Sequence, residues 1–269
     1  MDLNRPVVQD ELRKVKAGNK RLANIQSVLR KALSDSMYHN PPLIERNPLD
    51  GWCYQKNELP TKASDVDPFT IDEQARIIDA ATGQGKNLIQ FAFWTGMRTS
   101  ELVALDWTDI DWVRGYVVVE RAITQSSDEA ETTKTRAGRR EIKLLSMALK
   151  ALSAQREHTF LAGKEIFQNP NTLKRWDGDQ PIRKTMWTPV LKKAGVRYRR
   201  PYQTRHTYAS MMLSAGEHPM WVARQMGHAN WTMIAQIYGK WMPDADPFAG
   251  GRAEEKFNPE KPAMAATGG

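Results

Sequence analysis

The segment from residue 200 to residue 242 constrains the fold more than any other part of this sequence. Apolar side chains recur there at helical intervals and fall into three groups. Gly216, Gly227 and Gly239 punctuate these groups, and Pro219 stands where the first turn of a helix accepts proline. The pattern predicts three short helices joined by tight turns.

The same segment carries polar side chains that packing of such small helices does not explain. Arg205 precedes the first apolar group, His228 follows Gly227 directly, and Tyr238 precedes Gly239. A cation, an imidazole and a phenol placed at the ends of short helices indicate a functional site.

Five motifs of the chain together resemble the catalytic domain of the tyrosine recombinase (phage integrase) family. They are TGMRTSEL at 95–102, ETTKTRAGRREI at 131–142, YQTRH at 202–206, GH at 227–228 and IYGKW at 237–241. Each motif is weak alone, but together they occur in the order that the family has. The resemblance extends over nearly all of residues 65–242.

The resemblance implies a catalytic role for five side chains. Tyr238 would attack the DNA phosphorus and form a 3′-phosphotyrosine intermediate. Arg98 and Arg205 would bind the non-bridging phosphate oxygens, which suits the planar fork of arginine. Lys134 would protonate the leaving 5′ oxygen as general acid, and His228 would hydrogen-bond the phosphate or assist proton transfer.

Tyr202 departs from the family pattern, which has histidine three residues before the second arginine. A phenol can donate to a phosphate oxygen, so Tyr202 is a candidate auxiliary residue, but it is a poor base near neutral pH. The group that accepts the nucleophile's proton therefore stays open. Tyr202 and Tyr208 are alternative nucleophiles, although Tyr208 is expected to pack along its helix. His206 is expected to be a structural hydrogen-bonding residue.

The charge of the chain points to a polyanionic partner. Lys and Arg outnumber Asp and Glu by 39 to 31, a net charge of +8. Residues 183–205 hold eight basic side chains and no acid, and residues 134–143 hold five basic side chains and one acid. Either cluster alone could be a solvated surface, but two clusters beside a phosphate-handling site favour DNA. The expected DNA contacts are Arg136, Arg139, Arg140, Arg197, Arg199 and Arg200.

The remaining sequence predicts a mainly α fold with a small antiparallel β-sheet (α+β). Apolar stripes predict helices at 18–38, 146–162 and 182–194, and residues 86–95 are apolar nearly all round, as in a buried helix. Thr70 and Glu73 form the pattern of a capping box. Residues 111–125 predict a strand, which returns after a hairpin turn at Ala137–Gly138.

We interpret residues 1–61 as a partial core-binding domain with its linker, 62–242 as the catalytic domain and 243–269 as a mobile tail. The first of these resembles the end of the family's core-binding domain, including its Asn-Pro turn, here Asn47-Pro48. It supplies fewer helices than that domain has, so we expect the domain to be incomplete at its N-terminus.

The expected activity is site-specific recombination or integration of DNA, of phage or mobile-element origin. Double-stranded DNA is the expected partner, with a homotetramer on DNA and possible DNA-bending accessory proteins. A recombination-deficient DNA-binding remnant is the alternative, and a type IB topoisomerase is a weaker one. No metal or cofactor is implied, because the five histidines show no ligand spacing. One cysteine and the lack of a membrane-length apolar run suggest a cytoplasmic, nucleoid-associated protein.

Overall fold

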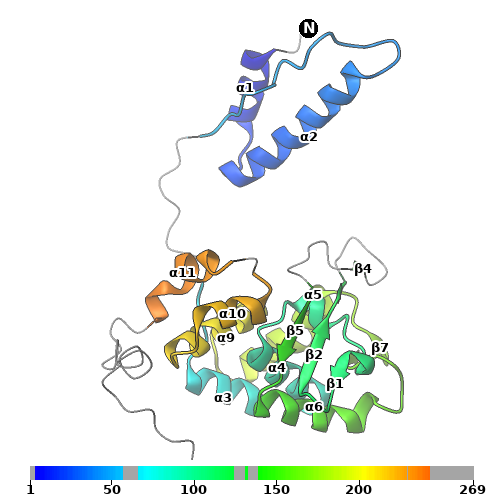
Figure 1. Ribbon diagram of the computed structural model, residues 1–269, viewed down its shortest axis with the longest axis vertical. Helices are drawn as coiled ribbons and strands as arrows, with labels where there is room; N and C mark the ends of the chain where they lie inside the picture. Colours follow the sequence, from blue (N-terminus) through cyan, green and yellow to red (C-terminus); the bar gives the residue numbers. More distant parts are fainter. Residues whose placement is uncertain (1–3, 57–65, 124–130, 133–138, 229, 243–269) are drawn as a thin grey trace, which may run out of the picture. The chain divides into compact units, whose positions relative to one another are not determined.

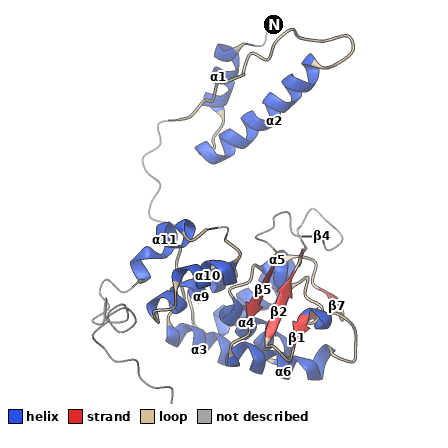
Figure 2. Cartoon of the chain, viewed as in Figure 1, coloured by secondary structure: helices blue, strands red, loops and turns tan. Residues whose placement is uncertain are grey.

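A computed structural model describes residues 4–56, 66–123, 131–132, 139–228 and 230–242. The chain divides into two compact units, Met1–Ser64 and Asp65–Gly269 (Figure 1). Helices dominate both units, and the strands gather in the second (Figure 2). The expected fold class, mainly α with a small antiparallel β-sheet, is confirmed, and the described residues form three small antiparallel sheets.

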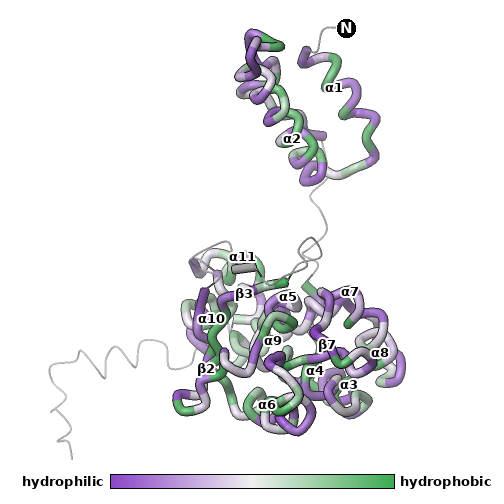
Figure 3. The backbone as a smooth tube through the Cα atoms, turned by 90° about the vertical axis from the view of Figure 1, so that its right-hand side faces the viewer, coloured by the Kyte–Doolittle hydropathy of each residue, from purple (hydrophilic) through white to green (hydrophobic). Residues whose placement is uncertain are grey.

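The N-terminal unit is a pair of helices closed by a loop. Helix α1 (Arg5–Lys14) begins at Asn4, whose side chain accepts from the Val7 amide, and α2 (Asn19–Met37) matches the predicted helix at 18–38. Hydrophobic and hydrophilic residues alternate along both helices (Figure 3). Their apolar stripes pack together and against Leu49 of the loop, which gives a core of Val8, Leu12, Leu22, Leu33 and Leu49.

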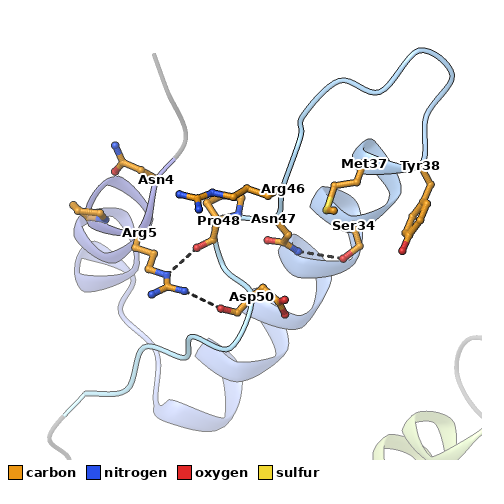
Figure 4. Close-up of a pocket in the computed structure, with 10 residues that line it drawn as sticks. Asn4, Arg5, Ser34, Met37, Tyr38, Arg46, Asn47, Pro48 and Asp50 are labelled. Carbon is orange, nitrogen blue, oxygen red and sulfur yellow. Dashed lines mark hydrogen bonds between the residues drawn. The ribbon is translucent and has the colours of Figure 1, made fainter.

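A turn at Asn47 ties this loop to both helices and borders a hollow of about 720 Å³ (Figure 4). The side-chain Nδ2 of Asn47 donates to Ser34 Oγ at 3.1 Å, and its Oδ1 accepts from the backbone N–H of Leu49 at 2.9 Å. Arg5 donates to the carbonyls of Pro48 and Asp50 at 2.9 and 2.8 Å. The start of α1 is thereby bound to the loop that follows α2.

The second unit begins with two helices that position the first arginine motif. Helix α3 (Ile71–Ala80) has the predicted capping box, with Glu73 N donating to Thr70 Oγ1 and Thr70 N to Glu73 Oε2. Helix α4 (Gly83–Thr95) is buried along most of its length, as predicted, and packs against α6 and α9. It ends at Gly96, which is in the left-handed conformation with φ 61°.

A three-stranded antiparallel sheet lies beside these helices in the order β1 (Ile110–Asp111), β2 (Tyr116–Val119), β5 (Arg140–Lys143). Val117 pairs with Ile142, and both are fully buried. The predicted strand at 111–125 is interrupted, because its end pairs separately as β3 (Arg121–Ala122) with β4 (Glu131–Thr132). A third sheet consists of β6 (Gln168–Asn169) paired with β7 (Lys174–Arg175). The predicted hairpin turn at Ala137–Gly138 lies outside the described residues.

One longer helix, α6, and several short helical segments complete the unit. They are α5 (Thr99–Leu102), the 3₁₀ turn η1 (Trp107–Asp109), α6 (Ser146–Thr159), α7 (Asp179–Ile182), the π-helical turn η2 (Arg183–Trp187) and α8 (Thr188–Lys193). The helix predicted at 182–194 is thus built from η2 and α8 and is entered through α7. In the described part of the chain, no helix is long and apolar enough to cross a membrane.

The three helices predicted between residues 200 and 242 are confirmed as α9 (Gln203–Ser214), α10 (Pro219–Met226) and α11 (Thr232–Tyr238). Gly216 and Gly227 have positive φ, as tight turns require. Gly239 does not, with φ −52°, and instead begins the 3₁₀ turn η3 (Gly239–Trp241). Helix α9 is buried on most of its surface, so its polar side chains, Arg205 among them, lie inside the unit.

Candidate active site

The turn after α4 delivers Arg98 to the start of α5. Two features of this turn require glycine at position 96. Its φ is positive, and a Cβ there would lie 2.4 Å from the Tyr208 ring. Arg98 Nη1 donates to Glu101 Oε1 at 2.7 Å, and its amide donates to Oε2 at 2.9 Å. The side chain of Arg98 keeps 35% of its surface exposed, so it is oriented by Glu101 while still facing solvent.

Glu101 is also held by a second arginine, Arg140 of β5. Arg140 donates to both carboxylate oxygens at 3.0 and 2.8 Å, and its Nε donates to the Gln225 carbonyl at 2.7 Å. Burial alone would raise the pKa of Glu101, but hydrogen bonds and charges from Arg140 and Arg98 outweigh it and lower the pKa to about 2. The ionised carboxylate joins α5, β5 and α10 around the site.

Arg205 lies deeper, with 1% of its surface exposed. Nη1 donates to the Gly96 carbonyl at 2.7 Å and Nη2 to the Met226 carbonyl at 2.6 Å. These bonds join the ends of α4 and α10 to α9. Burial, followed by the charge of Arg98, lowers the pKa of Arg205 to about 10, so the guanidinium is still charged at neutral pH.

His228 lies directly against Arg205. Its Nε2 is 3.2 Å from Arg205 Nη2, an N–H donor, so Nε2 is the acceptor. Burial and the neighbouring charges of Arg205 and Arg98 lower the pKa of His228 to about 4. The imidazole is therefore neutral at physiological pH, with its proton on Nδ1.

Tyr238, at the end of α11, has 2% of its surface exposed, and its Oη lies 2.6 Å from His206 Nδ1. Burial raises the pKa of the phenol well above its usual value, and the charge of Arg205 opposes this only in part. Tyr202 also packs against His206, with ring centroids 5.1 Å apart in an edge-on arrangement. The resting phenol is therefore protonated and has a nitrogen partner.

A groove of about 730 Å³ opens beside Arg98. Arg98, Arg183, Arg200 and Tyr202 line it together with the segment at Asp179. The groove thus joins the first arginine to the basic stretch at 183–205, and Asp179 is the one acid among the described residues that line it.

Metal ligands do not gather in the described part of the chain, where no three His, Cys, Asp or Glu side chains could hold one ion. The positive charge around the site comes from arginines instead. An oxyanion bound here would be met by guanidinium donors, which form short charge-assisted hydrogen bonds.

The phage integrase family model matches residues 69–242, well over half of the chain. The chain belongs to the phage integrase family. It is 36% identical over 199 residues to the prophage integrase IntR of Escherichia coli (strain K12), and 37% identical over 204 residues to a protein of the same strain named as defective, IntQ. Each match covers 66% of this chain but 48% and 50% of the relative, so the chain spans about half the length of these relatives.

Solved structures show the same fold as this integrase-family chain. The Tn1549 transposon integrase in complex with a circular intermediate DNA has a TM-score of 0.65 at 19% identity, over 92% of this chain and 82% of that one. The XerA recombinase has a TM-score of 0.53 at 20% identity, over 77% and 68%. At these identities the likeness concerns the fold.

The structure brings together most of the residues that sequence analysis nominates for catalysis in this integrase-family chain. Arg98, Arg205, His228 and Tyr238 lie around one site, and Tyr202 lies at its edge. Lys134 lies outside the described residues, and its role as general acid stays a prediction.

The arginines expected to contact DNA differ in their surroundings. Arg200 is exposed in the groove and Arg139 is exposed beside β5. Arg199 is paired with Asp67 and Glu73, Arg197 with Asp67 and Arg140 with Glu101. Arg136 lies outside the described residues. A role in DNA binding stays a prediction for all six, but the carboxylate partners favour a structural role for Arg199 and Arg140.

In this integrase-family chain, the sequence does not indicate that His206 contacts the nucleophile candidate Tyr238. His206 is predicted to form structural hydrogen bonds, and one of its partners in the structure is the Oη of Tyr238, 32 residues away. One signal points toward it: His206 stands four residues after Tyr202, on the same face of a helix, beside the position where the family has its histidine.

Proposed function

We propose that this chain is a site-specific DNA recombinase that cleaves and rejoins strands through a covalent 3′-phosphotyrosine at Tyr238. The observation that carries the proposal is the convergence of a tyrosine and two arginines on one site. Arg205 and His228 are 3.2 Å apart, and the charge of Arg205 acts on both His228 and Tyr238. Family membership supports this assignment.

The geometry suits stabilisation of a phosphoryl transition state. Arg98 and Arg205 are held by fixed partners, so little reorganisation is needed when negative charge develops on the non-bridging oxygens. Preorganised donors of this kind contribute roughly 3–4 kcal/mol each. Neutral His228 would donate from its protonated nitrogen, and Lys134 would protonate the leaving 5′ oxygen, as the family resemblance implies.

DNA is the proposed substrate and partner. The groove beside Arg98 would hold the phosphate backbone next to the cleaved bond, with Arg183 and Arg200 as its basic lining. The Tn1549 integrase, which shares the fold, is described in complex with DNA. The net charge of +8 also favours a polyanion.

The finer assignments are proposed from family membership. The N-terminal unit would be part of a core-binding domain, and recombination would be carried out by a homotetramer on double-stranded DNA, with DNA-bending accessory proteins where the site requires them. The protein would act in the cytoplasm, associated with the nucleoid. Integration of phage or other mobile DNA is the proposed role.

A suicide DNA substrate carrying a candidate attachment site tests the proposal. The wild-type chain should form a covalent adduct, and mass spectrometry should locate the phosphotyrosine at Tyr238. Tyr238→Phe should form no adduct while keeping its fold and DNA affinity, because phenylalanine retains the ring but has no oxygen to attack phosphorus.

Other outcomes have distinct meanings. An adduct at Tyr202 or Tyr208 would move the nucleophile, and no adduct on a competent site would favour a DNA-binding remnant. Fast relaxation of supercoiled DNA without strand exchange would favour a type IB topoisomerase.

A further inference from the structure

The proposed reaction requires the Tyr238 phenol to lose its proton, and the family's usual histidine is absent at the position of Tyr202. The phenol is buried, which favours its neutral form. Attack on phosphorus by a neutral phenol is slow unless a base removes the proton as the bond forms. In the structure one imidazole nitrogen lies within hydrogen-bond distance of the reacting oxygen.

That nitrogen is His206 Nδ1, 2.6 Å from Tyr238 Oη. The imidazole packs against two phenol rings, with its centroid 5.1 Å from Tyr202 and 5.7 Å from Tyr238. Trp241 also packs against Tyr238, with centroids 5.9 Å apart. Helices α9 and α11 therefore hold the two reacting groups in register before any DNA binds.

We propose that His206 is the general base that accepts the proton of Tyr238 during strand cleavage. This inference rests on the proposed function. In the cleavage step the Tyr238 Oη–P bond forms as the P–O5′ bond breaks, and the Oη proton moves to His206 Nδ1. The leaving 5′ oxygen takes a proton from a general acid, the role expected of Lys134. In rejoining, His206 returns its proton to Oη as the phosphotyrosine bond breaks.

Other groups near the phenol are less suited to this role. His228 Nε2 is occupied by the Arg205 guanidinium, whose charge also makes that imidazole a weak base. Tyr202 is itself a phenol and would have to ionise first. Among the described residues, the titratable and charged groups that act on His206 or on Tyr238 include Tyr202, Arg205 and His228. Of these described side chains, His206 is the one whose ring nitrogen lies within hydrogen-bond distance of Tyr238 Oη.

The sharpest test replaces His206 with asparagine and with alanine. Asparagine can place an amide near the position of Nδ1 and keep a hydrogen bond to Oη, but it cannot accept a proton. Single-turnover adduct formation on the suicide substrate should fall about 100-fold or more in both variants, within the range typical of general base catalysis. DNA affinity and thermal stability should stay close to wild type in His206→Asn. His158→Asn, an exposed histidine on α6, is the matched control.

A second measurement separates proton transfer from positioning. Fluorinated tyrosine at residue 238 lowers the phenol pKa, so its attack depends less on a base. The rate deficit of His206→Asn should then shrink as fluorine atoms are added, whereas a positioning defect would be unchanged.

Each outcome decides between the two proposals. An adduct rate in His206→Asn within about 3-fold of wild type, or a deficit that fluorination leaves unchanged, would overturn the role of His206 but leave the recombinase assignment intact. A wild-type chain that forms no adduct would overturn both.

Discussion

Arg140 and Glu101 form a two-bond ion pair inside the catalytic unit, with side-chain exposures of 6% and 2%. The pair joins β5 to α5, and Glu101 in turn orients Arg98. An equally well-formed pair, Arg114 with Glu141, lies on the surface with exposures of 56% and 44%. The exposed Arg114–Glu141 pair is a control for the two-bond geometry, whereas Glu101 is both buried and bound to Arg98 as well.

Glu101→Gln should destabilise the protein by about 3–5 kcal/mol, because it removes the carboxylate charge that the buried Arg140 and the nearby Arg98 both bind. Glu141→Gln should cost less than about 1 kcal/mol, since its pair is solvated. Urea unfolding of both variants measures the difference. Similar losses in the two would show that burial of the Arg140–Glu101 pair is unimportant.

Gly96→Ala should be more destabilising than Gly115→Ala. Both glycines have positive φ, 61° and 70°, which costs a non-glycine residue about 1–2 kcal/mol. A Cβ at Gly115 meets nothing within 4 Å, whereas at Gly96 it meets the Tyr208 ring at 2.4 Å. The clash should add about 1–3 kcal/mol. Thermal melts showing equal losses would contradict this.

Arg200→Ala should weaken DNA binding while stability stays unchanged, because Arg200 is exposed in the groove. The slope of log affinity against log salt should shrink by about 0.9 for each phosphate that the protein no longer neutralises. Arg199→Ala should instead lower stability, since that guanidinium pairs with Asp67 and Glu73 and lies 4.6 Å from the Phe69 ring centroid. Salt titrations and urea unfolding of both variants would reveal any reversal.

The stability of the catalytic unit should fall as the pH drops from about 6.5 to about 4. Burial and neighbouring arginines lower the pKa of His228 to about 4 in the folded chain, against about 6.5 when unfolded. In this window the unfolded state binds a proton that the folded state does not, so stability rises with pH. His228→Gln should flatten the profile of melting temperature against pH between these values. An unchanged profile would show that His228 is not its source.

The local features of this protein could be predicted from side chains that lie close together in the chain. The capping box of Thr70 and Glu73 and the helices between residues 200 and 242 depend on side chains three or four residues apart. A short stretch of sequence is therefore enough to predict them. Resemblance to the family nominated Arg98, Arg205, His228 and Tyr238 from their order along the chain.

The partner that each polar group meets could not be predicted from the sequence, because it depends on how distant segments pack. Arg199 and Arg200 are neighbours in one basic stretch, yet one is paired with Asp67 and Glu73 and the other lines the groove. Arg140 is held by a carboxylate 39 residues earlier, and His206 meets a phenol 32 residues later. Side-chain charge and hydrogen-bonding capacity belong to the residue, but their effect depends on distance and burial, which are set when remote helices and strands pack together.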